Sequence, residues 1–156
     1  MNAPEIPDWV RVYVEATNSH EPAAVTALMS PDVEVVDTAF GGTFTGREAV
    51  AQLLAGMNEG LSSDYRFDVK AVVESGESYA FEWVLSGTHD RGNPALGLPA
   101  TGKRFSVPGL TIGRRRAGLI TENRDYWNVA GLLTQVGLMP APPASTGEPE
   151  PGPASS

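Results

Sequence analysis

The dominant period of the hydrophobic pattern of this chain changes near Gly60, and that change restricts the folds available to it. Before Gly60 the apolar residues recur at helical spacing, and from residue 65 onward apolar and polar residues alternate as they do in strands. Helices followed by consecutive strands predict an α+β protein whose helices pack on one face of an antiparallel sheet. We expect the sheet to curve around the N-terminal helices, so that together they form a cone with an apolar pocket.

Three helices are predicted in the first part of the chain. The first begins at Asp8, which suits an N-cap, and its apolar face consists of Trp9, Val12, Tyr13 and Ala16. The second begins at Pro22, a good first-turn residue, and carries Val25, Leu28 and Met29. The third follows the capping-box pattern Thr45-Gly46-Arg47-Glu48 and ends at Gly60.

Five strands are predicted around these helices. A β-branched run at residues 33–37 lies between the second and third helices, and longer strand-like segments occupy residues 65–73, 78–89, 103–115 and 119–127. Ala117-Gly118 predicts a two-residue hairpin turn between the last two strands. Residues 90–102, rich in Gly and Pro, are expected to form a loop, and a short final helix at residues 129–136 should dock Leu132 and Leu133.

A single domain is predicted at residues 8–138, because 156 residues suit one sizeable core. Residues 1–7, which contain two prolines, precede it as a lead-in. Residues 139–156 are rich in Pro, Gly, Ser, Ala and Glu and have almost no apolar bulk. We therefore expect them to form a disordered tail.

Composition and charge exclude several classes of function. The net charge of −8 opposes nucleic-acid binding, and the one basic run, residues 114–116, is too short to reverse that field. There is no cysteine, and the only two histidines are far apart in the sequence, so we expect no disulfide and no metal site. No apolar stretch approaches the ~20 residues of a membrane helix, and no signal peptide is evident, so we expect a cytoplasmic protein that does not bind membranes.

The strand at residues 119–127 places an acid among apolar residues. Counting outward from the predicted turn gives three cross-strand pairs on one face: Asp125 with Leu110, Asn123 with Ile112, and Trp127 with Pro108. An acid on an apolar face is costly unless it is hydrogen-bonded or functional. Desolvation would raise its pKa and prepare it for general acid or base catalysis near neutral pH.

Each candidate residue also has an ordinary structural role open to it. Asp125 could pair with an arginine such as Arg104 or cap the final helix. Asp37, at a strand end before a glycine-containing loop, could bind its own backbone in a turn. Tyr13, on the apolar face of the first helix, could be a core aromatic residue whose hydroxyl meets a carbonyl.

His89 follows a predicted strand that ends Leu85-Ser86-Gly87-Thr88. It could line the mouth of the pocket as a proton shuttle, or it could pack against the loop at residues 90–102. Trp83 and Leu85 share the alternation of His89 and would make this wall of the pocket apolar.

Residues 10–37 resemble the opening of ketosteroid isomerases and other members of the NTF2-like superfamily. In that pattern a helix carries a tyrosine, an asparagine precedes the second helix, and a strand ends in an acid, as Tyr13, Asn18 and Asp37 do here. By resemblance, Tyr13 matches the tyrosine that donates to the oxyanion, and Asp37 matches the aspartate that shuttles the proton.

Residues 82–137 resemble the SnoaL-like polyketide cyclase branch of the same superfamily. The matching segments are Gly87-Thr88-His89, Gly97-Leu98-Pro99-Ala100-Thr101-Gly102-Lys103, Gly118-Leu119-Ile120, Tyr126-Trp127-Asn128 and Leu132-Leu133-Thr134-Gln135-Val136-Gly137. Together the two resemblances cover nearly the whole predicted domain. They imply the cone-shaped fold, and they imply a homodimer that pairs through the outer face of the sheet.

Three positions depart from these relatives. Leu110 or an apolar neighbour stands where the isomerase has its second oxyanion acid, which argues against steroid isomerisation. Trp83-Val84-Leu85 replaces the Arg-x-Asp pair of limonene-type epoxide hydrolases, although Asp125 matches their last-strand aspartate. Asn128 stands where many cyclase relatives carry an aspartate.

The leading hypothesis is a cofactor-independent cyclase or isomerase that acts on an apolar, oxygenated small molecule, such as a polyketide-type intermediate of antibiotic biosynthesis. The predicted catalytic residues are Asp125, Asp37 and Tyr13, and the predicted substrate-binding residues are Asn123, Trp127, His89, Trp83, Leu85, Leu110 and Ile112. Three alternatives stay open: an epoxide-opening hydrolase or cyclase, a non-catalytic module that binds or templates a small molecule, and a protein-interaction domain.

Overall fold

The structure, a computed structural model, describes residues 5–143. Along these residues the elements follow in the order α1 (Asp8–Asn18), α2 (Pro22–Thr26), β1 (Met29–Asp37), β2 (Gly42–Thr45), α3 (Arg47–Gly60), β3 (Arg66–Ser75), β4 (Ser78–Thr88), the 3₁₀-helix η1 (Pro94–Leu96), β5 (Arg104–Arg116), β6 (Leu119–Trp127) and α4 (Val129–Gln135). Helices precede a run of long strands, so the predicted α+β class is confirmed.

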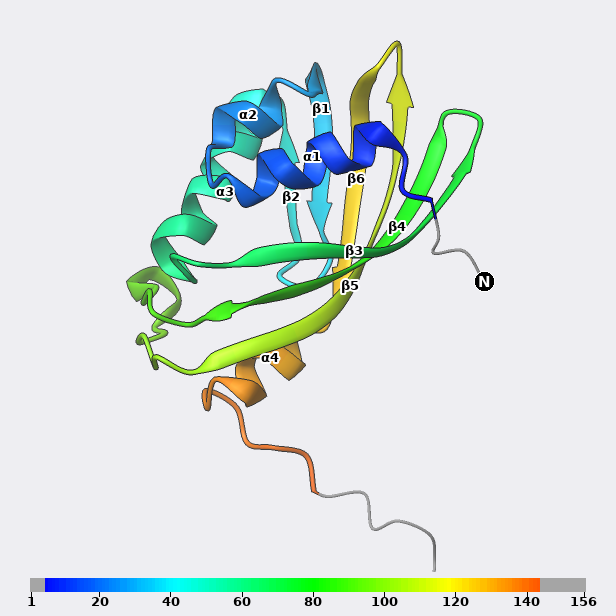
Figure 1. Cartoon of the computed structure of the whole chain (residues 1–156). Coiled ribbons are helices and arrows are strands. Elements are labelled where there is room, and N and C mark those ends of the chain that lie inside the picture. The colour runs from blue at the N-terminus through cyan, green and yellow to red at the C-terminus, as the bar shows by residue number, and fades with distance from the viewer. Residues whose placement is uncertain (1–4, 144–156) are drawn as a thin grey trace, which may run out of the picture.

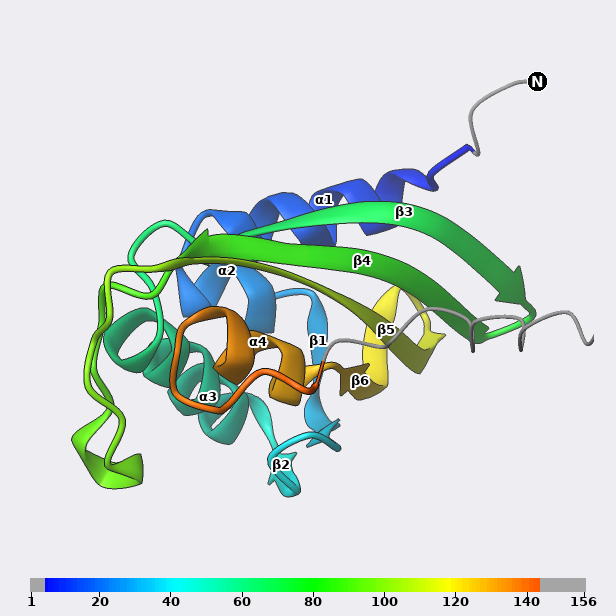
Figure 2. The same cartoon turned by 90° about the horizontal axis from the view of Figure 1, so that it is seen from below.

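The six strands form one curved, open sheet in the order β2-β1-β6-β5-β4-β3. Figures 1 and 2 show the sheet bending around one side, where α1, α2 and α3 lie, while α4 sits beside β5. The sheet is mixed and not purely antiparallel, because β1 and β6 run parallel. A tight turn fixes the relative direction of β5 and β6, but no tight turn links β1 to β6, so their direction could not be predicted locally.

The helices differ from the prediction at their ends and faces. In α1 the buried residues are Val10 and Thr17, whereas Val12 is half exposed, so the buried stripe lies about one residue away from the predicted one. Helix α2 ends at Thr26, and Met29 already begins β1. The predicted capping box is wrong, because Gly46 is the N-cap of α3.

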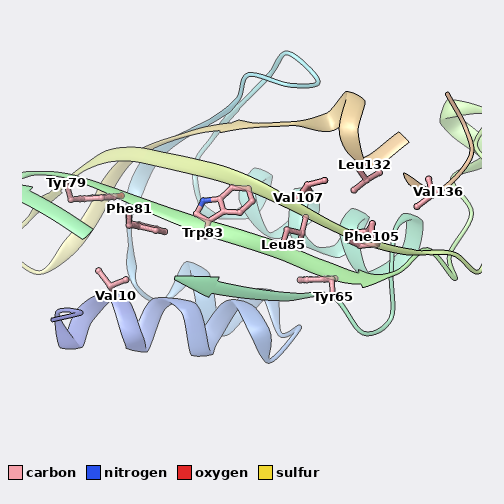
Figure 3. Packing of buried hydrophobic residues seen from close by; sticks show 10 residues of the cluster. All are labelled: Val10, Tyr65, Tyr79, Phe81, Trp83, Leu85, Phe105, Val107, Leu132 and Val136. Atoms are coloured by element: carbon pink, nitrogen blue, oxygen red, sulfur yellow. The ribbon is translucent and has the colours of Figure 1, made fainter. Parts of the chain in front are cut away.

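Two hydrophobic clusters hold the helices against the sheet. The first joins α1 and α4 to the inner faces of β4 and β5, as Figure 3 shows for Val10, Phe81, Trp83, Val107 and Leu132. The second lies between α2, α3, β1 and β6, and its buried members are Val25, Met29, Val33, Val35, Val50 and Ile120. Each buried aliphatic or aromatic side chain contributes about 1.5–3 kcal/mol, so these clusters supply the main force that fixes the curved arrangement.

A β-bulge in β6 decides which side chains face the helices. The hairpin begins as predicted, with Arg116 opposite Leu119 across the turn at residues 117–118, where Ala117 and Gly118 both have positive φ. The pairing then shifts by one residue, because Arg115 pairs with Ile120 but Arg114 pairs with Glu122. Thr121 is the extra residue. The next inward-facing residue after Ile120 is therefore Asn123, and the alternation continues from there.

Within residues 5–143, no helix combines the length and the hydropathy that a membrane crossing requires. The disorder predicted for residues 144–156 lies outside the described residues, as do residues 1–4 of the predicted lead-in.

Candidate active site

A cavity of about 370 Å³ lies between the helices and the inner face of the sheet. Its wall is mostly apolar and is built by α1, α3, α4 and the inward-facing residues of β1 and β3 to β6, among them Met29, Val35, Leu53, Met57, Phe67, Phe81, Trp83, Leu85 and Leu132. Among the lining residues, Asp37 and Asp125 are the charged ones. Two acids in an apolar cavity of this size form a candidate site for a small apolar molecule.

The two acids are neighbours on parallel strands. Asp37 ends β1 and Asp125 lies near the end of β6, and the two are register partners. The hydroxyl and the backbone N–H of Thr38 both donate to the carbonyl oxygen of Asp125, at 2.7 and 3.0 Å, and so tie the strand ends together. The parallel pairing of β1 and β6 therefore brings the carboxyl groups into one site.

Asp125 is the carboxyl group whose pKa the site changes most clearly. Its pKa is raised to about 6, mainly by burial in the apolar cavity and to a smaller extent by the nearby Asp37. Thr111 opposes this effect, since its hydroxyl donates to Asp125 Oδ1 at 2.7 Å. The indole N–H of Trp83 donates to the same Thr111 oxygen at 2.8 Å, so Trp83 orients the hydroxyl toward the carboxylate.

Asp37 holds the loop that follows it. Its Oδ1 accepts hydrogen bonds from the backbone N–H groups of Ala39 and Phe40 at 2.9 and 3.2 Å. The indole N–H of Trp127 also donates to this atom, at 3.2 Å. Asp37 therefore has the turn role that the sequence left open, and it also faces the cavity beside Asp125.

Tyr13 reaches the cavity from α1, and a buried chain of hydrogen bonds holds its hydroxyl. The side-chain amide of Asn123 donates to the Tyr13 oxygen at 3.0 Å, and the Tyr79 hydroxyl donates to the carbonyl oxygen of Asn123. Among the described residues the Tyr13 hydroxyl takes part only as an acceptor, so its own proton is available for a ligand. Burial and the nearby Asp125 raise the pKa of Tyr13, so the hydroxyl keeps that proton at neutral pH.

His89 lies at another part of the same cavity and is almost fully buried. Its Nδ1 lies 3.1 Å from the Thr101 hydroxyl and accepts from the Thr101 backbone N–H at 3.3 Å. Burial lowers the pKa of His89, although the adjacent Asp90 opposes this, so the imidazole is neutral at neutral pH. His89 thus lines the cavity and also contacts the loop at residues 90–102, while its role as a proton shuttle stays a prediction.

The structure brings most of the predicted site residues together in the cavity. The register of β5 and β6 explains why the others lie elsewhere. The residues that line the cavity are Tyr13, Asp37, Trp83, Leu85, His89, Asp125 and Trp127. Asn123 is buried behind Tyr13.

The predicted partners of β6 are wrong by one residue because of the bulge at Thr121. Asp125 pairs with Thr111, not with Leu110, and Asn123 pairs with Gly113, not with Ile112. Leu110 and Ile112 consequently lie on the outer face of the sheet, opposite Tyr126 and Arg124, and do not line the cavity.

Both structural alternatives for Asp125 are wrong within the described residues. No ion pair there involves Asp125, and Arg104 instead donates to the Thr88 hydroxyl at 3.3 Å. The final helix is capped by Asn128, whose side-chain oxygen accepts from the Gly131 backbone N–H at 2.9 Å. This cap gives Asn128 a structural role at the position where the family resemblance led us to expect an acid.

Sequence reasoning missed Thr111 and Tyr79 as parts of the site. The predicted pairs put Leu110 and Ile112 on the inner face, so Thr111, which lies between them, was expected on the outer face. Tyr79 carried a usable signal, because it shares the alternation of Phe81, Trp83 and Leu85 along β4. Within residues 5–143, no three His, Asp or Glu side chains lie close enough together to hold a metal ion.

The fold and the site define a class: curved α+β proteins of the ketosteroid isomerase-like, NTF2-like type, with acids in an apolar pocket. The family model of a SnoaL-like domain matches residues 10–123. The chain is also 30% identical over 124 residues to nogalonic acid methyl ester cyclase of Streptomyces nogalater, covering 80% of this chain and 91% of that protein. The chain therefore belongs to the SnoaL-like, polyketide cyclase-related family.

Solved structures agree with this placement. A Catenulispora acidiphila protein with a ketosteroid isomerase-like fold, solved in complex with trimethylamine, is similar at a TM-score of 0.76 and 26% identity, over 86% of this chain and 96% of that one. A Xanthomonas campestris pv. campestris protein proposed to be a polyketide cyclase is similar at a TM-score of 0.70 and 29% identity, over 82% of this chain and 93% of that one.

Proposed function

We propose that this protein is a cyclase or isomerase that needs no cofactor and acts on an apolar, oxygenated, polyketide-type molecule. The observation that carries the proposal is the Asp125 carboxyl, whose pKa is raised to about 6 in an apolar cavity that it shares with the Tyr13 hydroxyl. A base with a pKa just below neutrality is mostly ionised at pH 7 and still accepts a proton readily.

In the proposed reaction, Asp125 removes a proton from a carbon next to a substrate carbonyl. The electron pair of the broken C–H bond moves onto the carbonyl oxygen and forms an enolate, to which Tyr13 donates a hydrogen bond. In a cyclisation, the enolate carbon then attacks a second carbonyl of the same molecule, a C–C bond forms, and protonated Asp125 returns its proton to the new alkoxide. In an isomerisation, the same proton returns to a different carbon.

The apolar wall would fold the substrate so that its two reacting carbons meet. Trp83, Leu85, Phe81 and Trp127 lie on strands of the sheet, where packing restricts their rotamers. Holding two reacting groups in a fixed orientation contributes as much as ~7–11 kcal/mol in favourable cases. Orientation and a single positioned base are thus sufficient in principle for such a ring closure.

The test compares Asp125→Asn with the unmodified protein on nogalonic acid methyl ester, the compound in the name of the Streptomyces nogalater relative. We expect turnover to fall by ~10²–10⁴-fold while the dissociation constant changes little, because Asn keeps the shape and the hydrogen bond from Thr111. Tyr13→Phe serves as a second variant that removes the proposed oxyanion donor. Full turnover by both variants would exclude acid/base catalysis.

A second candidate function is a module that templates its ligand without acid/base chemistry. The hydrogen bonding of Asp37 favours this second candidate, since the Asp37 Oδ1 atom already accepts three hydrogen bonds, from Ala39, Phe40 and Trp127. That hydrogen bonding also weighs against the epoxide-opening alternative, which needs one carboxyl as base and the other as acid. Binding without any loss of turnover in Asp125→Asn would support the templating module.

We further propose a homodimer that pairs through the outer face of the sheet. On this face Leu110 and Tyr126 lie opposite each other on β5 and β6 and are both exposed. Exposed apolar side chains on neighbouring strands favour association. We also propose, from the sequence alone, that the protein acts in the cytoplasm.

A further inference from the structure

The cavity has a second polar region, which lies beyond the acid pair along β4. Phe81, Trp83 and Leu85 face the cavity from β4, and His89 follows just after the strand ends. Thr111 on β5 pairs with Phe81 on one side and with Asp125 on the other, so Phe81 and Asp125 lie at the same level of the sheet. From Phe81 to His89 there are eight residue steps, at most ~26 Å along an extended strand. His89 therefore lies in the same cavity but is displaced along the strand direction from the level of Asp125.

The hydrogen bonds around His89 fix its tautomer. The Thr101 backbone N–H, a group that can only donate, is shared between the His89 carbonyl oxygen at 3.1 Å and His89 Nδ1 at 3.3 Å, so Nδ1 acts as an acceptor and carries the lone pair. In a neutral imidazole the proton is then on Nε2. The backbone of His89 is also held, since its N–H donates to the Lys103 carbonyl at 2.8 Å and its carbonyl accepts from Gly102 at 2.8 Å. The Nε2–H group is thus a rigid neutral donor.

The surroundings of this donor specify what it could bind. Among the described residues, His89 Nε2 has no hydrogen-bond partner, and the cavity wall also includes Leu61 and, from the loop at residues 90–102, Leu96 and Leu98. Asn93, which also lines the cavity, accepts from the Leu96 backbone through Oδ1 and so leaves its amide N–H₂ as a second neutral donor. No lysine or arginine is among the lining residues, so an anionic group would lose its hydration without a counter-charge.

We propose that His89 is a specificity-determining residue whose Nε2–H donates a hydrogen bond to a neutral carbonyl oxygen, such as an ester or ketone, at the end of the substrate remote from Asp125. The inference rests on the proposed function, because it takes the reacting end of the substrate to be the end near Asp125 and Tyr13. It adds a substrate class: elongated, uncharged molecules with an apolar middle and a carbonyl acceptor at the far end.

The first experiment measures the histidine nitrogens directly. His20 and His89 are the only histidines, so the ¹⁵N spectrum of the imidazoles holds two spin systems, and His89→Phe assigns them by loss. We expect the Nε2–H tautomer for His89 in the unliganded protein. A methyl ω-(4-hydroxyphenyl)alkanoate should move the Nε2–H proton downfield, while a 4-alkylphenol of equal length should not. The Nδ1–H tautomer, or the same change with both probes, would overturn the proposal.

The second experiment measures binding of the same probes through the fluorescence of Trp83 and Trp127, which line the cavity. Across esters of increasing chain length, one length should bind best, because the separation of the two polar regions is fixed. His89→Phe should weaken that ester about tenfold and the matched 4-alkylphenol hardly at all, since one neutral hydrogen bond is lost. Leu98→Ala, a control at the same end, should weaken both probes equally.

The outcomes separate this inference from the proposed function. Full turnover by Asp125→Asn and Tyr13→Phe, together with a lost ester preference in His89→Phe, would remove the proposed chemistry and keep the role of His89. An inactive Asp125→Asn variant, together with unchanged ester binding in His89→Phe, would overturn the role of His89 alone. If His89→Phe does not fold, His20→Asn assigns the two spin systems by loss instead, and the ¹⁵N experiment on the unmodified protein still decides the question.

Discussion

The Thr111 hydroxyl determines how strongly the Asp125 carboxylate is stabilised. Thr111 donates to Asp125 Oδ1 at 2.7 Å, and the Trp83 indole N–H donates to Thr111 at 2.8 Å. This hydrogen bond lowers the pKa of Asp125 against the larger effect of burial. The base strength of the proposed catalyst is thus set partly by a neutral residue on the neighbouring strand.

We predict that Thr111→Val moves the pH dependence of turnover to higher pH. Valine has nearly the shape of threonine but cannot donate, so the pKa of Asp125 should rise above about 6. The measurement is the midpoint of the rising limb of kcat/KM against pH. Thr111→Ser keeps the hydroxyl and should leave the midpoint close to that of the unmodified protein. An unchanged midpoint in Thr111→Val would mean that Asp125 is not the titrating base.

We predict that Asp125 makes the folded state less stable as pH rises. Its pKa is raised in the folded protein from 3.8 to about 6, so the folded state binds more protons than the unfolded chain between these values. The free energy of unfolding should therefore fall through this window, by an amount on the order of 3 kcal/mol for such a shift. Below about pH 4 the effect disappears, because both states are protonated.

Urea unfolding of Asp125→Asn at pH 4 and pH 7 checks this prediction. The variant lacks the titrating group, so its advantage over the unmodified protein should grow between the two pH values. Asp8→Asn, at the exposed start of α1, is the matched control and should show no such growth. A constant difference between Asp125→Asn and the unmodified protein would contradict the raised pKa.

Side-chain alternation was enough to predict that Asn123, Asp125 and Trp127 share one face, because the rule depends only on local geometry. Their cross-strand partners were not predictable, since the bulge at Thr121 shifts the pairing and Thr121 carries no local sign of one. Tyr13 and Asp37 could be named only by family resemblance. Their local sequences fit ordinary core and turn roles, and Asp37 does have the turn role.

Among the secondary-structure elements, β5 makes room for Trp83 through a glycine. A Cβ at Gly109 would come within 2.2–2.5 Å of the Trp83 ring, which faces the cavity. In α3, by contrast, a Cβ at Gly56 would meet nothing within 4 Å. The two glycines therefore have opposite consequences for stability.

We predict that Gly109→Ala destabilises the protein by about 1–3 kcal/mol, because Trp83 must move or the strand must shift. Gly56→Ala should stabilise it by about 0.5–1 kcal/mol, since alanine favours the helical backbone. Urea unfolding at one pH measures both. Equal effects in the two variants would mean that the space beside Trp83 is not filled as described.

Most long elements follow from local pattern, and the short ones do not. The bounds of β6 were predicted to the residue, and those of α3, β4 and β5 to within one or two. The four-residue strand β2 was missed, because it begins at Gly42 directly after Gly41 and owes its existence to pairing with β1. The parallel pairing of β1 with β6 was missed for the same reason, since it depends on contacts between segments far apart in the chain.

Taken over its full surface, the folded chain exposes few large apolar residues within the described range, and some of them lie on the outer face of the sheet. Leu110 and Tyr126 are 37% and 43% exposed there, whereas Val12 is 50% exposed on α1, away from the strands. Val12 is therefore a suitable control position for testing the proposed homodimer.

We predict that the protein is a dimer by size-exclusion chromatography with light scattering. The double variant Leu110→Glu, Tyr126→Glu should shift it to a monomer, because two charges per chain would be buried unpaired at the interface. Val12→Glu should leave the dimer intact. A monomeric unmodified protein, or dissociation caused by Val12→Glu, would contradict pairing through the outer face.

The parallel contact between β1 and β6 also has a kinetic consequence. The bonds that assemble the site join Thr38 to Asp125 across 87 positions and Tyr13 to Asn123 across 110. Closing such long loops is entropically costly and slows folding. The shared environment of the two acids arises only when the last strand inserts between β1 and β5. A change in the protonation of Asp125 during refolding would therefore report when the last strand docks between β1 and β5.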